Sequence, residues 1–230
     1  MGCRTLPRRE QGQASELSSR ALLGTLSKQH PKLVEHVDRV ASLGEALAIK
    51  LGLPEREVER TRLAAKLHDV GKTAVPAAII DKPGPLSRDE WALVRQHTVI
   101  GERMLRATPA VSHIASIVRS SHERFDGSGY PDGAAGKNIP LGARIVFVCD
   151  AFDAMTSARP YSEAKTINVA LDELKRCAGT QFDPVVVAAF ADLLAGRGLP
   201  VWGTRSSRSG HSIPESARWI GWWSGRVGFP

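Results

Sequence analysis

The sequence predicts an all-α fold, and two observations carry this prediction. Between residues 31 and 194, apolar residues recur at intervals of three and four positions, as on helices that bury one face. Segments that contain Gly and Pro separate these periodic stretches and are typical of helix ends. With 230 residues, 42% of them hydrophobic, the chain can bury a proper core. We expect three regions. Residues 1–29 form a polar lead-in, which is disordered up to residue 20, and residues 30–195 form one domain. Residues 196–230 form a basic tail that is rich in Trp, Ser and Gly and lacks fixed structure.

The first two helices are expected where the apolar spacing is most regular. Within residues 33–51, apolar residues recur at helical intervals, and the Gly-Leu-Pro segment 52–54 ends that helix. A second helix is expected from about Glu55 to His68, because its apolar positions continue the pattern. Gly71 follows and favours a helix end.

Capping chemistry predicts the start of the next helix at Ser87. Glu90 stands three residues later, and this spacing forms a capping box. One helix is expected from there to Met104. Pro109 separates it from a further helix, whose inward positions run from Ile114 to His122.

A loop is expected at residues 126–138, because several glycines and a proline interrupt the pattern. Helices resume at residues 141–157, 166–178 and 183–194. Within the first of these, the β-branched content of residues 145–149 favours a strand. We expect a helix instead, because the segment continues through Asp150 and beyond without a turn.

Four of the seven histidines and two aspartates lie on or beside apolar stretches, where a buried metal centre would need them. These candidate ligands are His36, His68, Asp69, His97, His122 and Asp150. Imidazole and carboxylate together suit iron, zinc or manganese, and a carboxylate can bridge two ions. Asp69 is the natural bridge, since it adjoins His68 at the end of an apolar helix.

A single histidine on an apolar face is more often a core residue than a ligand. The number of candidates changes this weighing, because burying several histidines and two aspartates without a compensating cation is costly. Two ions held close together suit the hydrolysis of phosphoesters. Lys72, one turn beyond His68, can reach a phosphate oxygen, although an ordinary solvated lysine at a helix end is an equally good interpretation.

The ordered motifs resemble the HD-GYP domain, a bacterial class of phosphodiesterases that hydrolyse cyclic di-GMP. The resemblance covers about residues 30–192. It includes His68-Asp69-Val70-Gly71-Lys72, the run His122-Glu123-Arg124-Phe125-Asp126-Gly127-Ser128-Gly129-Tyr130-Pro131, Asp150-Ala151-Phe152-Asp153-Ala154-Met155-Thr156 and Arg159-Pro160-Tyr161. A His-Asp pair alone is common, but the set with Gly129-Tyr130-Pro131 in place is very specific.

The resemblance implies an all-helical HD bundle with an irregular GYP loop and two divalent transition-metal ions, iron, manganese or zinc. One ion would be held by His36, His68, Asp69 and Asp150, and the other by Asp69, His97 and His122. Asp69 and Lys72 would be catalytic, Lys72 by contacting the substrate phosphate and the bridging water. The substrate would also lie against Gly129, Tyr130, Pro131 and Arg159.

Two departures from the family pattern bear on the metals. The family has two consecutive histidines where this chain has Ser121 and His122, so the second ion is expected to bind more weakly. Members with a third metal carry a glutamate one turn before the first histidine, where this chain has Lys32. A lysine repels a cation, so no third site is expected.

The expected activity is hydrolysis of cyclic di-GMP to linear pGpG. The main alternative is a degenerate domain that binds cyclic di-GMP or a protein partner, such as a diguanylate cyclase, without efficient hydrolysis. A general HD phosphohydrolase for ordinary nucleotides is a third interpretation, which the Gly129-Tyr130-Pro131 motif disfavours.

Charge and composition exclude several other classes. The net charge of +7 is concentrated at the ends, with +2 on residues 1–20 and +3 on residues 203–230, so nucleic-acid binding is not expected. No apolar stretch has the length of a membrane span or signal peptide. Three widely spaced cysteines fit neither a zinc finger nor a disulfide framework. We therefore expect a cytoplasmic protein.

Overall fold

The computed structural model of the chain describes residues 8–30, 32–157 and 164–196. Over these residues there is no β-strand, and a single isolated bridge joins Ala178 to Phe182. The elements in order are α1 (Arg8–Gln29), α2 (Lys32–Lys50), α3 (Glu55–Leu67), η1 (Val70–Ala74), α4 (Ala77–Ile80), α5 (Arg88–Arg95), α6 (His97–Arg106), η2 (Pro109–Ile114), α7 (Ala115–Arg119), η3 (Gly136–Asn138), α8 (Leu141–Thr156), α9 (Ile167–Arg176) and α10 (Pro184–Gly196). The all-α prediction is confirmed.

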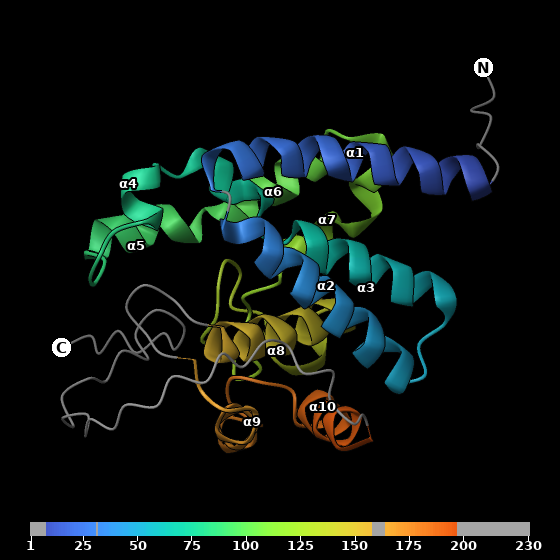
Figure 1. Cartoon of the computed structure of the whole chain (residues 1–230), viewed down its shortest axis with the longest axis vertical. Coiled ribbons are helices and arrows are strands. Elements are labelled where there is room, and N and C mark those ends of the chain that lie inside the picture. The colour runs from blue at the N-terminus through green and yellow to red at the C-terminus, as the bar shows by residue number, and fades with distance from the viewer. Residues whose placement is uncertain (1–7, 31, 158–163, 197–230) are drawn as a thin grey trace, which may run out of the picture.

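Helix α8 is the centre of the bundle. It lies between the α2–α3 pair and the α9–α10 pair, with α1 across the opposite end (Figure 1). Eleven of its residues, from Gly142 to Asp153, are buried. This explains the apolar run at residues 145–149, because a helix with neighbours on every side is hydrophobic all round. The helix predicted there is confirmed.

Two apolar clusters hold the bundle together on either side of α2 and α3. One joins α2 and α8 to α9 and α10 and includes the fully buried Leu47, Leu174 and Phe190. The other joins α1, α3 and the η2–α7 segment and includes Leu26 and Leu67. The two ends of the domain therefore meet at α2, α3 and α8. His36 lies on α2, Asp150 lies on α8, and His68 and Asp69 directly follow α3.

Residues 8–29 correct one prediction, because they form helix α1 where the first 20 residues were expected to be disordered. Leu23 and Leu26 are buried in the second apolar cluster, and the Ser15 hydroxyl donates to the Ala110 carbonyl at 2.7 Å. Because so few of its residues are buried and apolar, helix α1 shows little of the spacing that marks an amphipathic helix. The helix is stabilised by tertiary packing that the local sequence does not reveal.

Two predicted helices are interrupted where site residues lie. The expected helix up to Met104 begins at the predicted Ser87–Glu90 capping box but breaks at Gln96, between α5 and α6. The helix expected to reach His122 ends at Arg119, so His122 lies in the turn that follows α7. In both places a side chain competes for a backbone carbonyl: the His97 ring bonds the Val94 carbonyl, and the Ser121 hydroxyl bonds the Val118 carbonyl.

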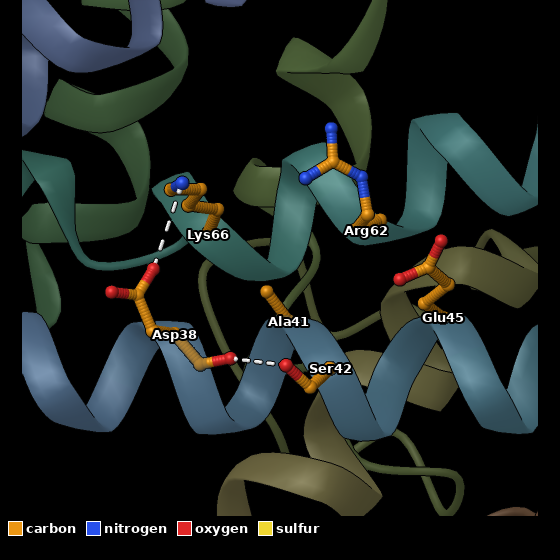
Figure 2. Close-up of a pocket in the computed structure, with 6 residues that line it drawn as sticks. All are labelled: Asp38, Ala41, Ser42, Glu45, Arg62 and Lys66. Carbon is orange, nitrogen blue, oxygen red and sulfur yellow. Dashed lines mark hydrogen bonds and ion pairs between the residues drawn. The ribbon is translucent and has the colours of Figure 1, made fainter.

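A pocket of about 230 Å³ lies on the outer side of the α2–α3 pair (Figure 2). Its lining is Asp38, Ala41, Ser42, Glu45, Arg62 and Lys66, none of them a predicted site residue. Lys66 lies 3.6 Å from the Asp38 carboxylate, and Arg62 pairs with Glu59 at 2.8 Å. Both bases of this pocket are thus paired with acids, and the Lys66–Asp38 pair joins α3 to α2.

Along the described residues, no helix combines the length and hydrophobicity that a membrane span requires.

Candidate metal centre

Asp69 lies at the centre of the site, in the turn between α3 and η1, and is fully buried. One carboxylate oxygen, Oδ2, accepts a hydrogen bond from Lys72 Nζ at 2.7 Å. The other, Oδ1, lies 3.5 Å from His68 Nε2 and 3.6 Å from His97 Nε2. Burial alone would raise the pKa of Asp69, but His68, Lys72 and His97 hold that pKa well below its ordinary value. The neighbours of Asp69 therefore favour its ionised form, beside two histidines.

Glycine at position 71 brings Asp69 to His97. A Cβ at this position would lie 1.9 Å from the His97 carbonyl oxygen and 2.7 Å from the Gly101 amide nitrogen. Only a residue without a side chain allows η1 to touch the first turn of α6. The His-Asp-Val-Gly sequence thus supplies two candidate ligands and the close approach that brings Asp69 to His97.

His36, on α2, is held between two aspartates of α8. Its Nδ1 lies 2.7 Å from Asp153 Oδ2, and its Nε2 lies 3.0 Å from Asp150 Oδ1. Arg39 fixes Asp153 in turn, at 2.5 Å from its Oδ1. Burial would lower the pKa of His36, but the hydrogen bonds to Asp150 and Asp153 outweigh it and raise that pKa to about 9. Asp150 also lies 3.8 Å from His68 Nε2, so His36, His68 and Asp150 form one cluster.

His97 and His122 form the second cluster with Asp69, with their ring centroids 4.9 Å apart. Burial lowers the pKa of His97 to about 4 and that of His122 to about 3. Both imidazoles are neutral near pH 7, which is the form that binds metal ions.

The backbone orients His68 and His97 for metal binding. Each directs its Nδ1–H to a carbonyl three residues earlier, at 2.7 Å from Ala65 O and 2.6 Å from Val94 O. This leaves the unprotonated Nε2 of each ring facing Asp69. Anchoring of one ring nitrogen by a carbonyl is the usual arrangement of a metal-binding histidine.

The donor set fits metal ions. In the described part of the chain, His68 Nε2, His97 Nε2 and Asp69 Oδ1 are buried without a hydrogen-bond partner. Their separations of 3.5 and 3.6 Å are too long for good hydrogen bonds. They suit atoms that share a cation, which lies about 2.0–2.2 Å from each nitrogen and oxygen ligand. Two groups meet this condition, both of which contain Asp69: His36–His68–Asp69 and Asp69–His97–His122.

The predicted GYP loop covers the second cluster. The Tyr130 ring stacks on His122 with centroids 5.2 Å apart and planes 16° apart. At Gly129, a Cβ would lie 2.2 Å from the Arg124 amide nitrogen, so glycine is required for the loop to pack on this turn. Pro131 follows Tyr130 through a cis peptide bond. Arg159, also predicted to bind substrate, lies outside the described residues.

Ser121 does not present its hydroxyl to the second cluster. It is 1% exposed, and its Oγ donates to the Val118 carbonyl at 2.8 Å. Lys32 is the first residue of α2 and stands one helical turn before His36, the position where family members with a third metal carry a glutamate.

Sequence reasoning missed Asp153 and Arg39, which orient His36. Each stands three residues after a predicted ligand, Asp153 after Asp150 and Arg39 after His36. Because residues three apart share a helix face, this spacing is the signal that could have found them.

The fold and the site together define an all-helical domain with a buried histidine–aspartate centre that fits metal ions. The HD domain family matches residues 21–186, so the chain belongs to the HD domain family, and its motifs and relatives place it in the HD-GYP group.

Curated relatives support this assignment. The chain is 45% identical over 163 residues to a cyclic di-GMP phosphodiesterase response regulator of Xanthomonas campestris, covering 70% of this chain and 42% of that protein. It is 41% identical over 160 residues to a cyclic di-GMP phosphodiesterase of Thermotoga maritima, covering 69% and 44%. A 3'3'-cGAMP-specific phosphodiesterase of Vibrio cholerae is 40% identical over 154 residues, covering 66% and 30%. The chain thus spans less than half the length of these relatives.

Solved structures share the fold. A cyclic GMP-AMP-specific phosphodiesterase from V. cholerae matches with a TM-score of 0.60 at 22% identity, covering 79% of this chain and 49% of that one. An HDG"Y"P protein from Bdellovibrio bacteriovorus matches with a TM-score of 0.60 at 21% identity, covering 81% and 62%.

Proposed function

We propose that this chain is a metal-dependent phosphodiesterase that hydrolyses cyclic di-GMP to linear pGpG. The observation that carries the proposal is the sharing of Asp69 by two ligand groups, which suits a pair of divalent ions. The relatives named as cyclic di-GMP phosphodiesterases support the choice of substrate. When bound, two iron, manganese or zinc ions would neutralise the phosphodiester and lower the pKa of an attacking water.

The protein residues supply placement and charge. His36, His68 and Asp150 would hold one ion, and His97 with His122 the other, while Asp69 joins the two groups. Lys72 is tied to Asp69 and half-buried, and this position beside the shared ligand supports a role for its ammonium group in contacting a phosphate oxygen. It orients the phosphodiester and stabilises the added negative charge of the transition state.

The test is turnover by the purified chain loaded with manganese or iron. Cyclic di-GMP should give pGpG by chromatography, and Asp69→Asn should abolish the product. Asp172→Asn is the matched control, because Asp172 is an exposed carboxylate on α9 and should behave as wild type. The proposal is wrong if the metal-loaded wild type gives no more pGpG than the Asp69 variant.

Ser121 favours a second candidate function, in which the domain binds the dinucleotide without efficient hydrolysis. Its hydroxyl is committed to the Val118 carbonyl, so the second group has three protein ligands, Asp69, His97 and His122. Calorimetry that finds binding of cyclic di-GMP without turnover would support this function. A gain of turnover in Ser121→His would support it further, whereas efficient turnover by the wild type would exclude it.

A further inference from the structure

The last residue of α5, Arg95, is an arginine held on aromatic rings beside the metal centre. Its guanidinium carbon lies 5.4 Å from the centroid of the Tyr130 ring and 5.9 Å from that of Trp91. The residue is half-buried. Contacts of this length are favourable cation–π interactions, and they fix where the guanidinium lies.

Arg95 has no anionic partner within the described part of the chain. No carboxylate there lies within 4.0 Å of its guanidinium, and its Nε is buried without a hydrogen-bond partner. Other half-buried arginines are each paired with an acid, as Arg39 is with Asp153, Arg119 with Glu102 and Arg144 with Asp183. A half-buried cation without a counterion is costly, so an anion from outside is the expected partner.

The position of Arg95 identifies where that anion belongs. The Tyr130 ring that contacts Arg95 also stacks on His122, and its centroid lies 6.3 Å from that of the His97 ring. His97 itself follows Arg95 by two residues, across the helix break at Gln96. Arg95 therefore contacts the same tyrosine ring that packs on the second ligand group. An anion bound to Arg95 would lie close to the metal centre.

We propose that Arg95 binds the second, non-reacting phosphate of the cyclic dinucleotide while the first lies at the metal centre. This inference rests on the proposed function, and it adds a binding residue that the motifs did not indicate. A cyclic dinucleotide carries two phosphodiesters in one ring, so a substrate held at the centre necessarily brings a second anion close by. Guanidinium suits this anion because its planar fork donates two parallel hydrogen bonds to a phosphate.

The experiment compares Arg95→Gln and Arg95→Lys with the control Arg103→Gln. Arg103 is an exposed arginine on the next helix, so this control removes the same charge from outside the site. We expect Arg95→Gln to raise the Kd for cyclic di-GMP about 10- to 100-fold, as loss of a charge-assisted hydrogen bond does, and Arg95→Lys to raise it less. Arg103→Gln should leave the Kd unchanged.

Two further readouts separate a phosphate contact from a structural role. Metal content and thermal unfolding of both Arg95 variants should match the wild type. The Kd of the wild type should rise with salt more steeply than that of Arg95→Gln, because one screened charge contact is missing in the variant. The fall in kcat/KM caused by Arg95→Gln should be larger for cyclic di-GMP than for bis(4-nitrophenyl) phosphate, which has a single phosphodiester; equal falls for the two substrates would overturn the contact with the second phosphate.

The outcomes distinguish this inference from the proposed function. If the wild type hydrolyses cyclic di-GMP and Arg95→Gln binds it as Arg103→Gln does, the Arg95 inference alone is overturned. Loss of metal or of folding in both Arg95 variants overturns it as well, because the role is then structural. Absence of both binding and turnover in the metal-loaded wild type overturns the proposed function, and the Arg95 inference with it.

Discussion

Asp153 Oδ2 lies 2.7 Å from His36 Nδ1, and this contact decides which nitrogen of His36 faces the centre. With Nδ1 held by Asp153, Nε2 points to Asp150 at 3.0 Å. Arg39 holds the Asp153 carboxylate at 2.5 Å, so the orientation of His36 depends on a chain of three residues. None of these hydrogen bonds involves a residue of the predicted substrate site.

Asp153→Asn should weaken metal binding at the first group about 10- to 100-fold, the usual cost of losing a carboxylate that orients a ligand histidine. Isothermal titration of the metal-free chain with manganese would measure the change. Asp172→Asn, an exposed substitution of the same kind on α9, should not alter the titration. Equal affinities in the two variants would show that Asp153 does not position His36.

Asp69→Asn should remove more metal than loss of any other ligand, because Asp69 belongs to both groups and His122 to one. We expect about two ions per wild-type chain, about one in His122→Ala and close to none in Asp69→Asn. Metal analysis of protein purified without oxygen checks these ratios. A single ion in the wild type, retained in His122→Ala, would contradict the two-group arrangement.

The sequence was sufficient to predict a helix where the residues of that helix alone carry the pattern that indicates it. The regular apolar spacing of residues 33–51 and 55–68 predicted α2 and α3 closely, and the Ser87–Glu90 box predicted the start of α5. It failed where contacts between distant elements decide the structure. Helix α1 is stabilised by packing on η1 and η2, and its few buried leucines leave little pattern.

The candidate site shows the same division. The candidate ligands could be predicted because the motifs resemble a known family, and the structure brings His36, His68, Asp69, His97, His122 and Asp150 together. The residues that orient them depend on tertiary contacts. Arg95 reaches Tyr130 only because a helix break and a distant loop meet, and no local spacing in the sequence indicates that contact.

Gly71→Ala should destabilise the domain by about 3 kcal/mol or more, because the new methyl group would overlap the His97 carbonyl and force η1 from α6. The same displacement separates Asp69 from His97, so metal content should fall as well. Gly24→Ala is the control, since it adds a methyl group on α1 with no atom within 4 Å. It should stabilise the helix by about 0.5–1 kcal/mol. Chemical denaturation measures both changes, and equal effects would refute the steric argument.

Arg119 ties the GYP loop to α6 and should make stability depend on pH. Its guanidinium lies 2.6 Å from Glu102 and 2.7 Å from Asp132. Burial would raise the pKa of Glu102, but hydrogen bonds from Arg119 and Arg106 lower it below its ordinary 4.5. A lowered pKa in the folded state means that the stabilisation is present above pH 4.5 and lost as the pH falls through the folded value.

Arg119→Gln should therefore cost about 1–2 kcal/mol near pH 7, a value reduced by the partial exposure of the pair. The difference from wild type should shrink as the pH falls below about 4.5, where Glu102 takes up a proton in both proteins. Urea denaturation at a series of pH values measures it, with the exposed Arg103→Gln as control. A difference that stays constant from pH 7 down to the acid transition would mean that Arg119 acts through packing and not through its charge.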